Sequence, residues 1–178
     1  AFISGGGALD HNIGEFLNAI GLPTLQGYGL TEASPVVSCN LLGQIKVDTV
    51  GPAFKTNKIK IAKDGEILIK GENVMLGYWN KKEETEAVIK DNWLYTGDIG
   101  EIDSDGFLKI TDRKKDIIVS LGGDNISPTK IENLLCLNEH IKQSFVYGDK
   151  KNYIVAILVV EKNFTTQDLI TTHLNNLN

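Results

Sequence analysis

Residues 110–119 read ITDRKKDIIV, and the pattern of this stretch divides the chain in two. Five charged residues, DRKKD at 112–116, stand between two apolar segments that are each short enough to be strands. A charged segment between apolar strands is typical of a connection between folded units. We therefore predict a domain boundary here, with one domain over residues 1–112 and a second over residues 113–178.

The residues before this boundary predict a β-rich subdomain over residues 46–112. Apolar and polar residues alternate around the turn sequence KDG within residues 58–69, and again around DSDG within residues 99–110. Alternation on both sides of a glycine turn favours a β-hairpin in each place. Between the two hairpins, we expect Asn80 to cap a short charged helix that ends near Ile89.

Residues 1–45 are predicted to form an α/β piece. A run of apolar side chains at helical spacing lies between Asp10, which is suited to begin a helix, and Gly21, which is suited to end one. The sequence SGGGA at 4–8 predicts a glycine-rich turn, and LQGYGLTE at 25–32 predicts a strand that runs into a glycine loop. A helix between two such loops fits an α/β layer.

The segment after the boundary predicts a strand, a helix and a hairpin. The strand is expected at 116–119 and the hairpin over 143–160, around GDKKN. Ser127 is a favourable N-cap for the helix, and Pro128 suits its first position. Beyond Thr165 the sequence is polar and weakly patterned, and we interpret it as helical.

Composition excludes several classes of protein. The chain has 178 residues, 42% of them hydrophobic, which is enough to bury a core. Its net charge of −5 argues against a nucleic-acid-binding domain, which is usually basic. The longest apolar run, residues 153–160, is too short for a membrane span, which needs about 20 residues. Cys39 and Cys136 lack the spacing of a metal site, so we expect reduced thiols and a cytoplasmic protein.

A single arginine stands among the 18 basic residues, and it lies at the predicted boundary. Arginine presents a planar fork of donors that lysine cannot reproduce. Arg113 is therefore a candidate for a task that depends on geometry. The alternative is that one arginine has to stand somewhere in a lysine-rich chain.

The two glycine-rich loops are candidate sites for a phosphate or a flat base. Glycine lets backbone N–H groups approach a ligand closely, which suits both kinds of ligand. Neither loop has the spacing of a P-loop, and neither fits the dinucleotide fingerprint well. A tight turn is the simpler interpretation of either loop alone.

Three side chains of the second loop, and one farther along the chain, could contact a nucleotide. Thr31 and Glu32 offer a hydroxyl and a carboxylate to a phosphate and its Mg²⁺, which prefers hard oxygen ligands. An acidic first turn of a helix is the alternative for this pair. Tyr28 could stack on a base or pack in the core. Asp98, in YTGD at 95–98, could accept both hydroxyls of a ribose or could be a plain turn residue.

Taken together and in order, the motifs resemble those of the adenylate-forming enzymes, which include acyl-CoA synthetases, luciferases and peptide-synthetase adenylation domains. The four motifs are SGGGAL at 4–9, QGYGLTE at 26–32, YTGD at 95–98 and DRKKD at 112–116. Within that family, GGDNISPTKIE at 122–132 and GDKKNYIVA at 148–156 look most like long-chain fatty acid–CoA ligases. The resemblance covers nearly the whole chain and fades after about Lys162.

The resemblance implies a fold and a reaction. Residues 1–112 would be the C-terminal part of a large AMP-binding domain, and residues 113–178 the hinge and start of a small α+β lid domain. A fatty acid carboxylate would attack the α-phosphate of Mg·ATP, giving an acyl-adenylate and pyrophosphate, and CoA would then displace AMP to give a thioester. No nucleic acid is expected as a partner, and the lipid substrate implies peripheral contact with a membrane.

Carried onto this chain by motif, the resemblance implies nucleotide contacts from four motifs. They are Gly5, Gly6, Gly7, Ala8, Gly27, Tyr28, Gly29, Thr31, Asp98 and Arg113. The first loop would line the adenine, and Tyr28 would stack on it. Asp98 would hold the ribose hydroxyls, and Arg113 would support the ribose side.

The remaining roles concern the chemical steps. Thr31 would contact the α-phosphate, and Glu32 would hold Mg²⁺. Lys115 resembles the hinge on which the C-terminal domain rotates between the half-reactions. Gly122 and Gly123 would lie near the tunnel through which the CoA thiol enters.

Two elements of the family's site are missing from this sequence. They are the Ser/Thr/Gly-rich phosphate loop with its lysine and the late lysine that bridges the carboxylate and the α-phosphate. We therefore expect a fragment that lacks both ends, works with the remainder of the same enzyme and is inactive alone. Two alternatives stay open: a ligase or carrier-protein-loading adenylation enzyme for another carboxylate, and a non-catalytic remnant of a split gene.

Overall fold

The computed structural model describes residues 1–7 and 9–161 and separates the chain into two compact units. The first unit runs from Ala1 to Lys114, and the second begins at Lys115. Ala8 and the helix predicted beyond Thr165 lie outside the described residues. Within them, no helix has the combination of length and apolar character that a membrane span requires.

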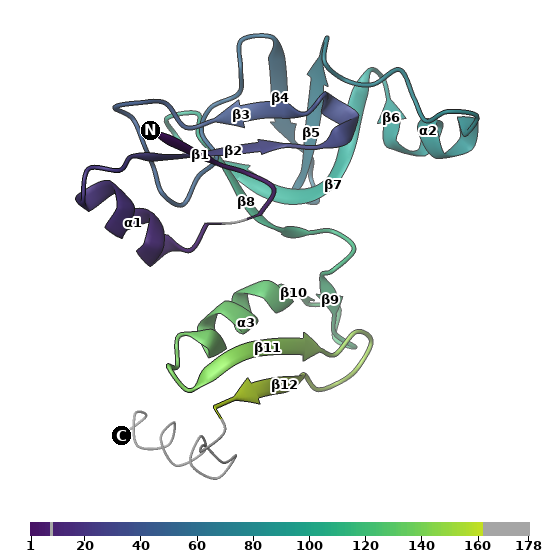
Figure 1. Ribbon diagram of the computed structural model, residues 1–178. Coiled ribbons are helices and arrows are strands. Elements are labelled where there is room, and N and C mark those ends of the chain that lie inside the picture. The colour runs from purple at the N-terminus through teal and green to yellow at the C-terminus, as the bar shows by residue number, and fades with distance from the viewer. Residues whose placement is uncertain (8, 162–178) are drawn as a thin grey trace. The chain divides into compact units, whose positions relative to one another are not determined.

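The helices and strands of both units are labelled in Figure 1. The first unit contains β1 (Phe2–Ser4), α1 (His11–Ala19), β2 (Thr24–Gly29), the 3₁₀ helix η1 (Thr31–Ala33), β3 (Val36–Cys39), β4 (Asn57–Ile61), β5 (Glu66–Gly71), α2 (Lys82–Val88), β6 (Ile89–Lys90), β7 (Trp93–Ile102) and β8 (Leu108–Arg113). The second unit contains β9 (Ile118–Val119), β10 (Asn125–Ile126), α3 (Pro128–Cys136), β11 (Ile141–Tyr147) and β12 (Val155–Val160).

A three-stranded sheet, β1-β2-β3, carries the two glycine-rich loops. β1 pairs with β2 in parallel, with Ser4 opposite Gln26, and β2 pairs with β3 in the antiparallel sense. Because parallel strands end at the same edge of a sheet, the segments after Ser4 and after Gly29 leave it on the same side. Gln26 also ties the first loop to β2, since its Oε1 accepts a hydrogen bond from the Leu9 N–H at 3.3 Å.

α1 is bounded near the two residues that the sequence predicted, although its C-cap is Ile20 and Gly21 is the residue after the cap. Asp10 is the N-cap, and its Oδ1 accepts a hydrogen bond from the Ile13 N–H at 3.0 Å. At the other end, Gly21 takes a φ of 78°, and the N–H groups of Gly21 and Leu22 return to carbonyls in the last turn. This is a Schellman ending, which requires a left-handed residue just beyond the helix.

The fully buried residue of α1 is a glycine, whereas most of its apolar side chains are exposed. Gly14 is the buried residue of the helix, and a Cβ there would come within 2.5 Å of Val47 Cγ1. Of the four residues whose spacing predicted the helix, Ile13, Phe16 and Ile20 are each more than half exposed and Leu17 is partly buried. The spacing therefore located the helix correctly, but these side chains do not enter the core of the described unit.

Both hairpins predicted for the β-rich region form, and they share one five-stranded sheet. β4 pairs with β5 and β7 pairs with β8, all antiparallel, in the order β4-β5-β7-β6 with β8 also on β7. β7 begins at Trp93 and is longer than the predicted strand, because Leu94 and Tyr95 already pair with β5. The motif that contains Asp98 therefore lies within a strand of the sheet.

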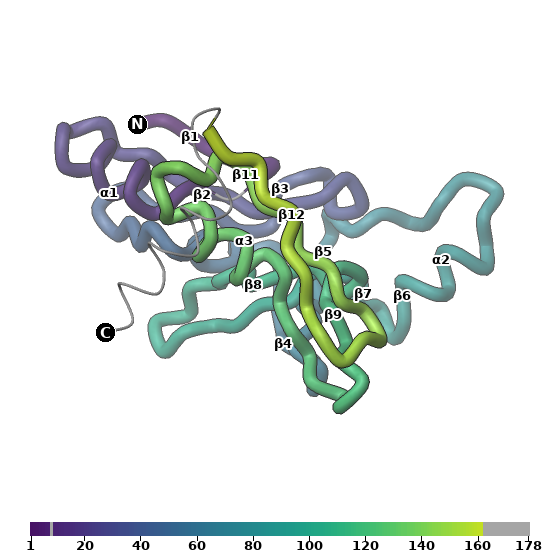
Figure 2. The backbone as a smooth tube through the Cα atoms, turned by 90° about the horizontal axis from the view of Figure 1, so that it is seen from below, coloured from purple at the N-terminus to yellow at the C-terminus, as the bar shows by residue number. Residues whose placement is uncertain are grey.

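α2 corrects one prediction about helix capping. The N-cap of this helix is Lys81, which makes no side-chain capping hydrogen bond, and Asn80 precedes it with a φ of 54°. Asparagine tolerates this left-handed conformation better than most residues, so Asn80 serves the turn instead of the cap. Figures 1 and 2 show α2 and β6 at the margin of the first unit, beyond β7.

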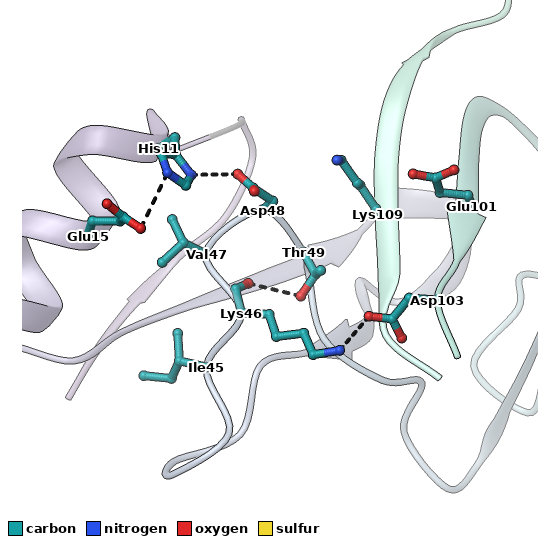
Figure 3. A pocket seen from close by; sticks show the side chains of 10 residues that line it. All are labelled: His11, Glu15, Ile45, Lys46, Val47, Asp48, Thr49, Glu101, Asp103 and Lys109. Carbon is teal, nitrogen blue, oxygen red and sulfur yellow. Dashed lines mark hydrogen bonds and ion pairs between the residues drawn. The ribbon is translucent and has the colours of Figure 1, made fainter. Parts of the chain in front are cut away.

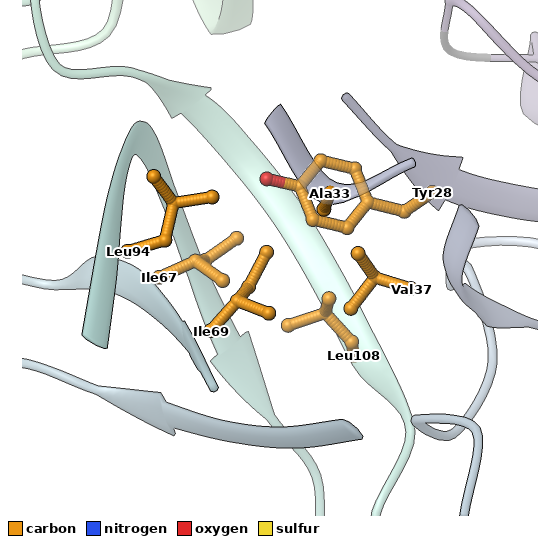
Figure 4. Close-up of a cluster of buried hydrophobic side chains, with 7 residues drawn as sticks. All are labelled: Tyr28, Ala33, Val37, Ile67, Ile69, Leu94 and Leu108. Atoms are coloured by element: carbon orange, nitrogen blue, oxygen red, sulfur yellow. The ribbon is translucent and has the colours of Figure 1, made fainter. Parts of the chain in front are cut away.

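One hydrophobic core joins the two sheets of the first unit, as Figure 4 shows. Its buried members are Tyr28, Ala33, Val37, Ile67, Ile69, Leu94 and Leu108. They come from β2, η1 and β3 on one side and from β5, β7 and β8 on the other. The strands that carry the nucleotide motifs are therefore packed against each other through this cluster.

The second unit is built from α3 and antiparallel strand pairs. Ser127 is the N-cap of α3, because its Oγ accepts a hydrogen bond from the Lys130 N–H at 3.2 Å, and Pro128 is the first helical residue. β11 and β12 form the predicted hairpin, and β9 pairs with β10. Glu132 fastens α3 to β11, since its Oε1 accepts a hydrogen bond from the Val146 N–H at 2.8 Å.

Candidate active site

Asp98 is the centre of the candidate site. It lies in β7, and the register sets it directly opposite Arg113 of β8. Directly opposed residues of an antiparallel pair project from the same face, so this register brings the two side chains together. Arg113 Nε lies 2.8 Å from Asp98 Oδ1, and the two side chains are 55% and 5% exposed. A buried carboxylate thus has a partly solvated guanidinium as its counter-ion.

Tyr28 of β2 holds the other oxygen of this carboxylate. Its hydroxyl donates a hydrogen bond to Asp98 Oδ2 at 2.6 Å. Burial, together with this hydrogen bond, raises the pKa of Tyr28 above its ordinary value, so the hydroxyl remains a donor. The ring belongs to the buried core, with 7% of the residue exposed (Figure 4). Packing in the core is therefore one role of Tyr28, and stacking on adenine stays a prediction.

The first glycine-rich loop lies beside the second motif. A Cβ on Gly5 would stand 3.6 Å from the carbonyl oxygen of Gly27, in ordinary contact. Gly6 adopts a φ of 83°, which favours glycine, and a Cβ on Gly7 would meet nothing within 4 Å. The structure thus brings Gly5 and Gly27 together, as a common nucleotide site requires.

Gly29 is required by the fold itself. A Cβ at this position would stand 1.7 Å from the carbonyl oxygen of Pro35, which also accepts a hydrogen bond from the Leu30 N–H at 2.8 Å. The chain therefore closes tightly around η1, and a side chain at Gly29 would collide with the backbone. For this glycine the tight turn accounts for the residue without a ligand.

Thr31 and Glu32 begin η1, directly after β2. Thr31 is exposed, whereas Glu32 is held from the segment between β5 and α2. Glu32 Oε1 accepts a hydrogen bond from the Tyr78 hydroxyl at 2.8 Å, and this bond raises the pKa of Tyr78. The carboxylate predicted to hold a metal thus has a fixed partner that no motif identified.

The donors at this position fit Mg²⁺ that arrives with a nucleotide. Within residues 1–7 and 9–161, no group of three or more His, Cys, Asp and Glu side chains is placed to hold a metal ion by itself. Mg²⁺ usually takes one or two protein carboxylates and completes its shell with substrate phosphates and water. The Glu32 carboxylate and the adjacent Thr31 hydroxyl are hard oxygen donors of the kind that this requires.

Glu66 and Lys114 support the site, although sequence reasoning assigned neither of them. Glu66 is 4% exposed; its Oε1 accepts a hydrogen bond from the Gly97 N–H at 2.9 Å, and its Oε2 accepts one from Lys114 Nζ at 2.8 Å. Lys114 Nζ also donates to Asp64 at 2.7 Å, and the bonds to Asp64 and Glu66 raise the pKa of Lys114. The one available signal was an acidic residue at the start of an apolar strand.

The other predicted site residues belong to the second unit. Lys115 is exposed in the turn between β8 and β9. Gly122 lines a hollow of about 470 Å³ between residues 120–126 and residues 148–154, and Gly123 has a φ of 88°. The hinge role of Lys115 and the thiol-tunnel role of the two glycines stay predictions.

A hollow of about 480 Å³ in the first unit is lined by other residues, shown in Figure 3. None of its lining residues belongs to the predicted nucleotide site. His11 Nδ1 lies 2.7 Å from Asp48 Oδ1, and the Nε2 atom lies 3.4 Å from Glu15. Lys46 Nζ lies 2.6 Å from Asp103 Oδ2. The His11 pairs are half exposed or more, and the Lys46–Asp103 pair is less exposed. The contact with Asp48 joins α1 to the loop before β4, and the contact with Asp103 joins that loop to the turn between β7 and β8.

Comparison with known families identifies the class of protein. The AMP-binding enzyme family matches residues 1–79, and the C-terminal domain of AMP-binding enzymes matches residues 115–176. The chain therefore belongs to the AMP-binding enzymes, the adenylate-forming family that its motifs resemble. The second match begins at Lys115, where the second unit begins.

Curated relatives within this family include ligases for different acids. The long-chain-fatty-acid–CoA ligase FadD15 of Mycobacterium bovis is 41% identical over 161 residues, which are 90% of this chain and 27% of that protein. The 2-succinylbenzoate–CoA ligase of Listeria monocytogenes is 39% identical and is matched over 93% of this chain and 36% of its own length. The chain thus spans about a third of the length of these relatives.

Solved structures support the same fold. The o-succinylbenzoate CoA synthetase of Bacillus subtilis in complex with ATP and a magnesium ion has a TM-score of 0.81 and 32% identity, over 95% of this chain and 38% of that one. Its complex with the acyl-adenylate intermediate has a TM-score of 0.85 and 30% identity, over 99% and 39%. These similarities confirm the predicted fold class.

Proposed function

We propose that these residues belong to a long-chain fatty acid–CoA ligase, an ATP-dependent acyl-CoA synthetase. Membership of the AMP-binding enzymes supports activation of an acid by adenylation, and the identity with FadD15 supports a fatty acid as that acid. The observation that carries the proposal is the buried Asp98 carboxylate, which Tyr28 and Arg113 hold from both sides. A carboxylate with fixed oxygens is suited to bind a diol.

Asp98 can bind a ribose while it keeps both of its present partners. An ionised carboxylate offers about four lone-pair sites. One site on Oδ1 faces Arg113 and one on Oδ2 faces the Tyr28 hydroxyl, so each oxygen can accept one ribose hydroxyl as well. The guanidinium of Arg113 would lie on the ribose side and donate from its planar fork.

The residues after β2 would serve the phosphates. Thr31 would donate its hydroxyl to the α-phosphate, and Glu32 would bind Mg²⁺ through the oxygen that the Tyr78 hydroxyl does not hold. When bound, Mg²⁺ stabilises the negative charge that builds on the α-phosphate as the fatty acid carboxylate attacks. The adenine would lie along the first glycine-rich loop, residues 5–8.

The second unit would serve the second half-reaction. There the CoA sulfur bonds to the acyl carbon, and the bond from that carbon to the AMP phosphate oxygen breaks. We assign Lys115 as the hinge that allows the C-terminal unit to change orientation between the two steps. Gly122 and Gly123 would line the path of the thiol, because residues without side chains leave room for a narrow ligand.

A ligase for an aromatic acid is the second candidate. The identity with 2-succinylbenzoate–CoA ligase is 39%, only two points below the 41% identity with the fatty acid ligase. Such a small difference favours the fatty acid without deciding the acid. The chemistry of adenylation and of CoA transfer is the same for both.

The test uses a complete enzyme that contains residues 1–178. ATP–pyrophosphate exchange is measured with palmitate and with 2-succinylbenzoate, and palmitate is expected to support the faster exchange. Glu32→Gln should slow exchange strongly, because an amide is a poorer Mg²⁺ ligand than a carboxylate, and it should affect thioester formation from supplied acyl-adenylate less. Glu86→Gln, on exposed α2, is the matched control.

Two results would contradict the proposal. Exchange with neither acid in the unmodified enzyme would refute the activity. Equal loss of both half-reactions in Glu32→Gln would refute the metal role of Glu32. Residues 1–178 on their own are expected to give no exchange, because positioning two reactants needs the complete set of contacts.

A further inference from the structure

Residues 73–78, which lie in the connection between β5 and α2, are hydrogen-bonded to the segment that carries Glu32. Asn73 Nδ2 donates a hydrogen bond to the carbonyl of Ala33 at 2.7 Å. The Met75 N–H donates to the carbonyl of Glu32 at 2.8 Å. Two backbone carbonyls of η1 are therefore held by one connection, and the backbone of Glu32 is fixed before any ligand binds.

Tyr78 completes this attachment through the Glu32 side chain. Its hydroxyl donates to Glu32 Oε1 at 2.8 Å. The backbone of Tyr78 is itself anchored, because its N–H donates to Thr85 Oγ1 at 2.9 Å, and that hydroxyl donates to the carbonyl of Lys81 at 2.7 Å. The backbone of the residue whose hydroxyl reaches Glu32 is therefore held in place by α2.

This geometry suits a carboxylate that has to meet a metal in one orientation. A flexible Glu side chain loses several rotatable conformations when it binds a cation, and a partner that fixes it beforehand reduces that loss. The hydrogen bond engages Oε1 and leaves Oε2 for a cation. Hydrogen-bond partners of metal-binding carboxylates typically change metal affinity by about 10–100-fold.

We propose that Tyr78 is a positioning residue for nucleotide-bound Mg²⁺, acting through the Glu32 carboxylate that it orients. The inference rests on the metal role proposed above for Glu32. It adds a residue from outside the four nucleotide motifs to the adenylation machinery. It also gives residues 73–78 a purpose beyond joining a strand to a helix.

The experiment measures metal binding directly in a complete enzyme that contains residues 1–178. Mn²⁺, used in place of Mg²⁺, is titrated in the presence of saturating ATP and followed by electron paramagnetic resonance. Tyr78→Phe removes only the hydroxyl and should weaken Mn²⁺ binding by about tenfold, the lower end of the range because Tyr78 is partly exposed. Its affinity for ATP without metal, measured in EDTA, should be unchanged.

The control variants separate a structural effect from the proposed one. Tyr147→Phe makes the same chemical change on an exposed residue of β11 and should leave both affinities unchanged. Thr85→Val removes the hydrogen bond that anchors the Tyr78 backbone but leaves the Tyr78 hydroxyl in place. It should therefore also weaken Mn²⁺ binding, by less than Tyr78→Phe does. This second variant decides the question if Tyr78→Phe does not fold.

Each contrary outcome has its own meaning. Unchanged Mn²⁺ affinity in folded Tyr78→Phe, or an equal loss of metal-free ATP binding, would overturn the inference. Glu32→Gln serves as the reference in the same titration. If Glu32→Gln weakens Mn²⁺ binding and Tyr78→Phe does not, the inference fails while the proposed function stands. If Glu32→Gln has no effect, the metal role of Glu32 fails, and the inference fails with it.

Discussion

Arg113→Lys tests whether the sole arginine of the chain is needed for its shape or only for its charge. The substitution keeps a positive charge opposite Asp98 in the β7–β8 register. It replaces a planar fork of donors with a single ammonium group, which cannot place two parallel hydrogen bonds. If Arg113 supports the ribose side of the nucleotide, AMP binding should weaken although the net charge is unchanged.

The geometry allows separate estimates of the effect of Arg113→Lys on the free energy of unfolding and on AMP binding. The Arg113 side chain is 55% exposed, so solvent screens its ion pair with Asp98, and lysine keeps the positive charge of that pair. The free energy of unfolding should therefore fall by less than about 1 kcal/mol in Arg113→Lys. Hydrogen bonds to charged groups contribute about 1.5–3 kcal/mol, and lysine retains part of this. We expect a loss of about 1.4 kcal/mol in AMP binding, which is about tenfold in Kd.

Both quantities can be measured on a complete enzyme that contains these residues. Isothermal titration calorimetry gives the Kd for AMP, and urea denaturation gives the free energy of unfolding. An unchanged Kd would refute a geometric role for Arg113 in nucleotide binding. A loss of stability well above about 1 kcal/mol would show instead that the residue serves the fold.

Three further predictions concern the hinge, a turn and an ion pair. Lys115→Pro fixes φ near about −65° and should spare one half-reaction while damaging the other in single-turnover assays; equal losses in a folded variant would contradict a hinge. Gly29→Ala should lower the free energy of unfolding by about 1–3 kcal/mol, because its Cβ would stand 1.7 Å from the Pro35 carbonyl oxygen; an unchanged Tm would contradict this close approach. The hydrogen bond to Asp48 raises the pKa of His11 above its ordinary value of 6.5, so the stabilisation is complete below 6.5 and is lost as the pH rises through the raised pKa. The Tm should therefore fall over this range, and a His11→Gln variant with the same pH profile would disprove the effect.

Elements that depend on neighbours in sequence could be predicted from the sequence. Asp10 and Ser127 were identified as N-caps because a cap needs a side-chain oxygen within a few residues of free N–H groups. The hairpins were identified because a turn and its two flanking strands lie within a short stretch. Asn80 was assigned wrongly because asparagine suits both an N-cap and a left-handed turn, and the two positions are adjacent here.

Contacts between distant residues could not be predicted in the same way. The motifs named Tyr28 and Asp98 for one ligand, but the hydrogen bond between them depends on how two sheets pack on one core. Tyr78 gave no signal, and the signal of Glu66 was only its position at the start of an apolar strand, because a loop tyrosine and a strand glutamate are ordinary residues until their partners are known. Local patterns report on backbone preferences, whereas these partners are set by the packing of the whole unit.

The attachment of Lys114 has a mechanical consequence. Lys114 directly precedes Lys115. Its ammonium is held by Asp64 and Glu66, and its backbone N–H donates to the carbonyl of Gly97 at 2.8 Å. A change of backbone conformation at Lys115 would therefore occur next to a residue that is anchored to the β4–β5 hairpin through Asp64 and Glu66. Glu66 also accepts a hydrogen bond from the Gly97 N–H, so the same carboxylate holds the backbone beside Asp98. If Lys115 is the hinge proposed above, the residues that hold Asp98 would keep their positions when the backbone changes conformation at Lys115.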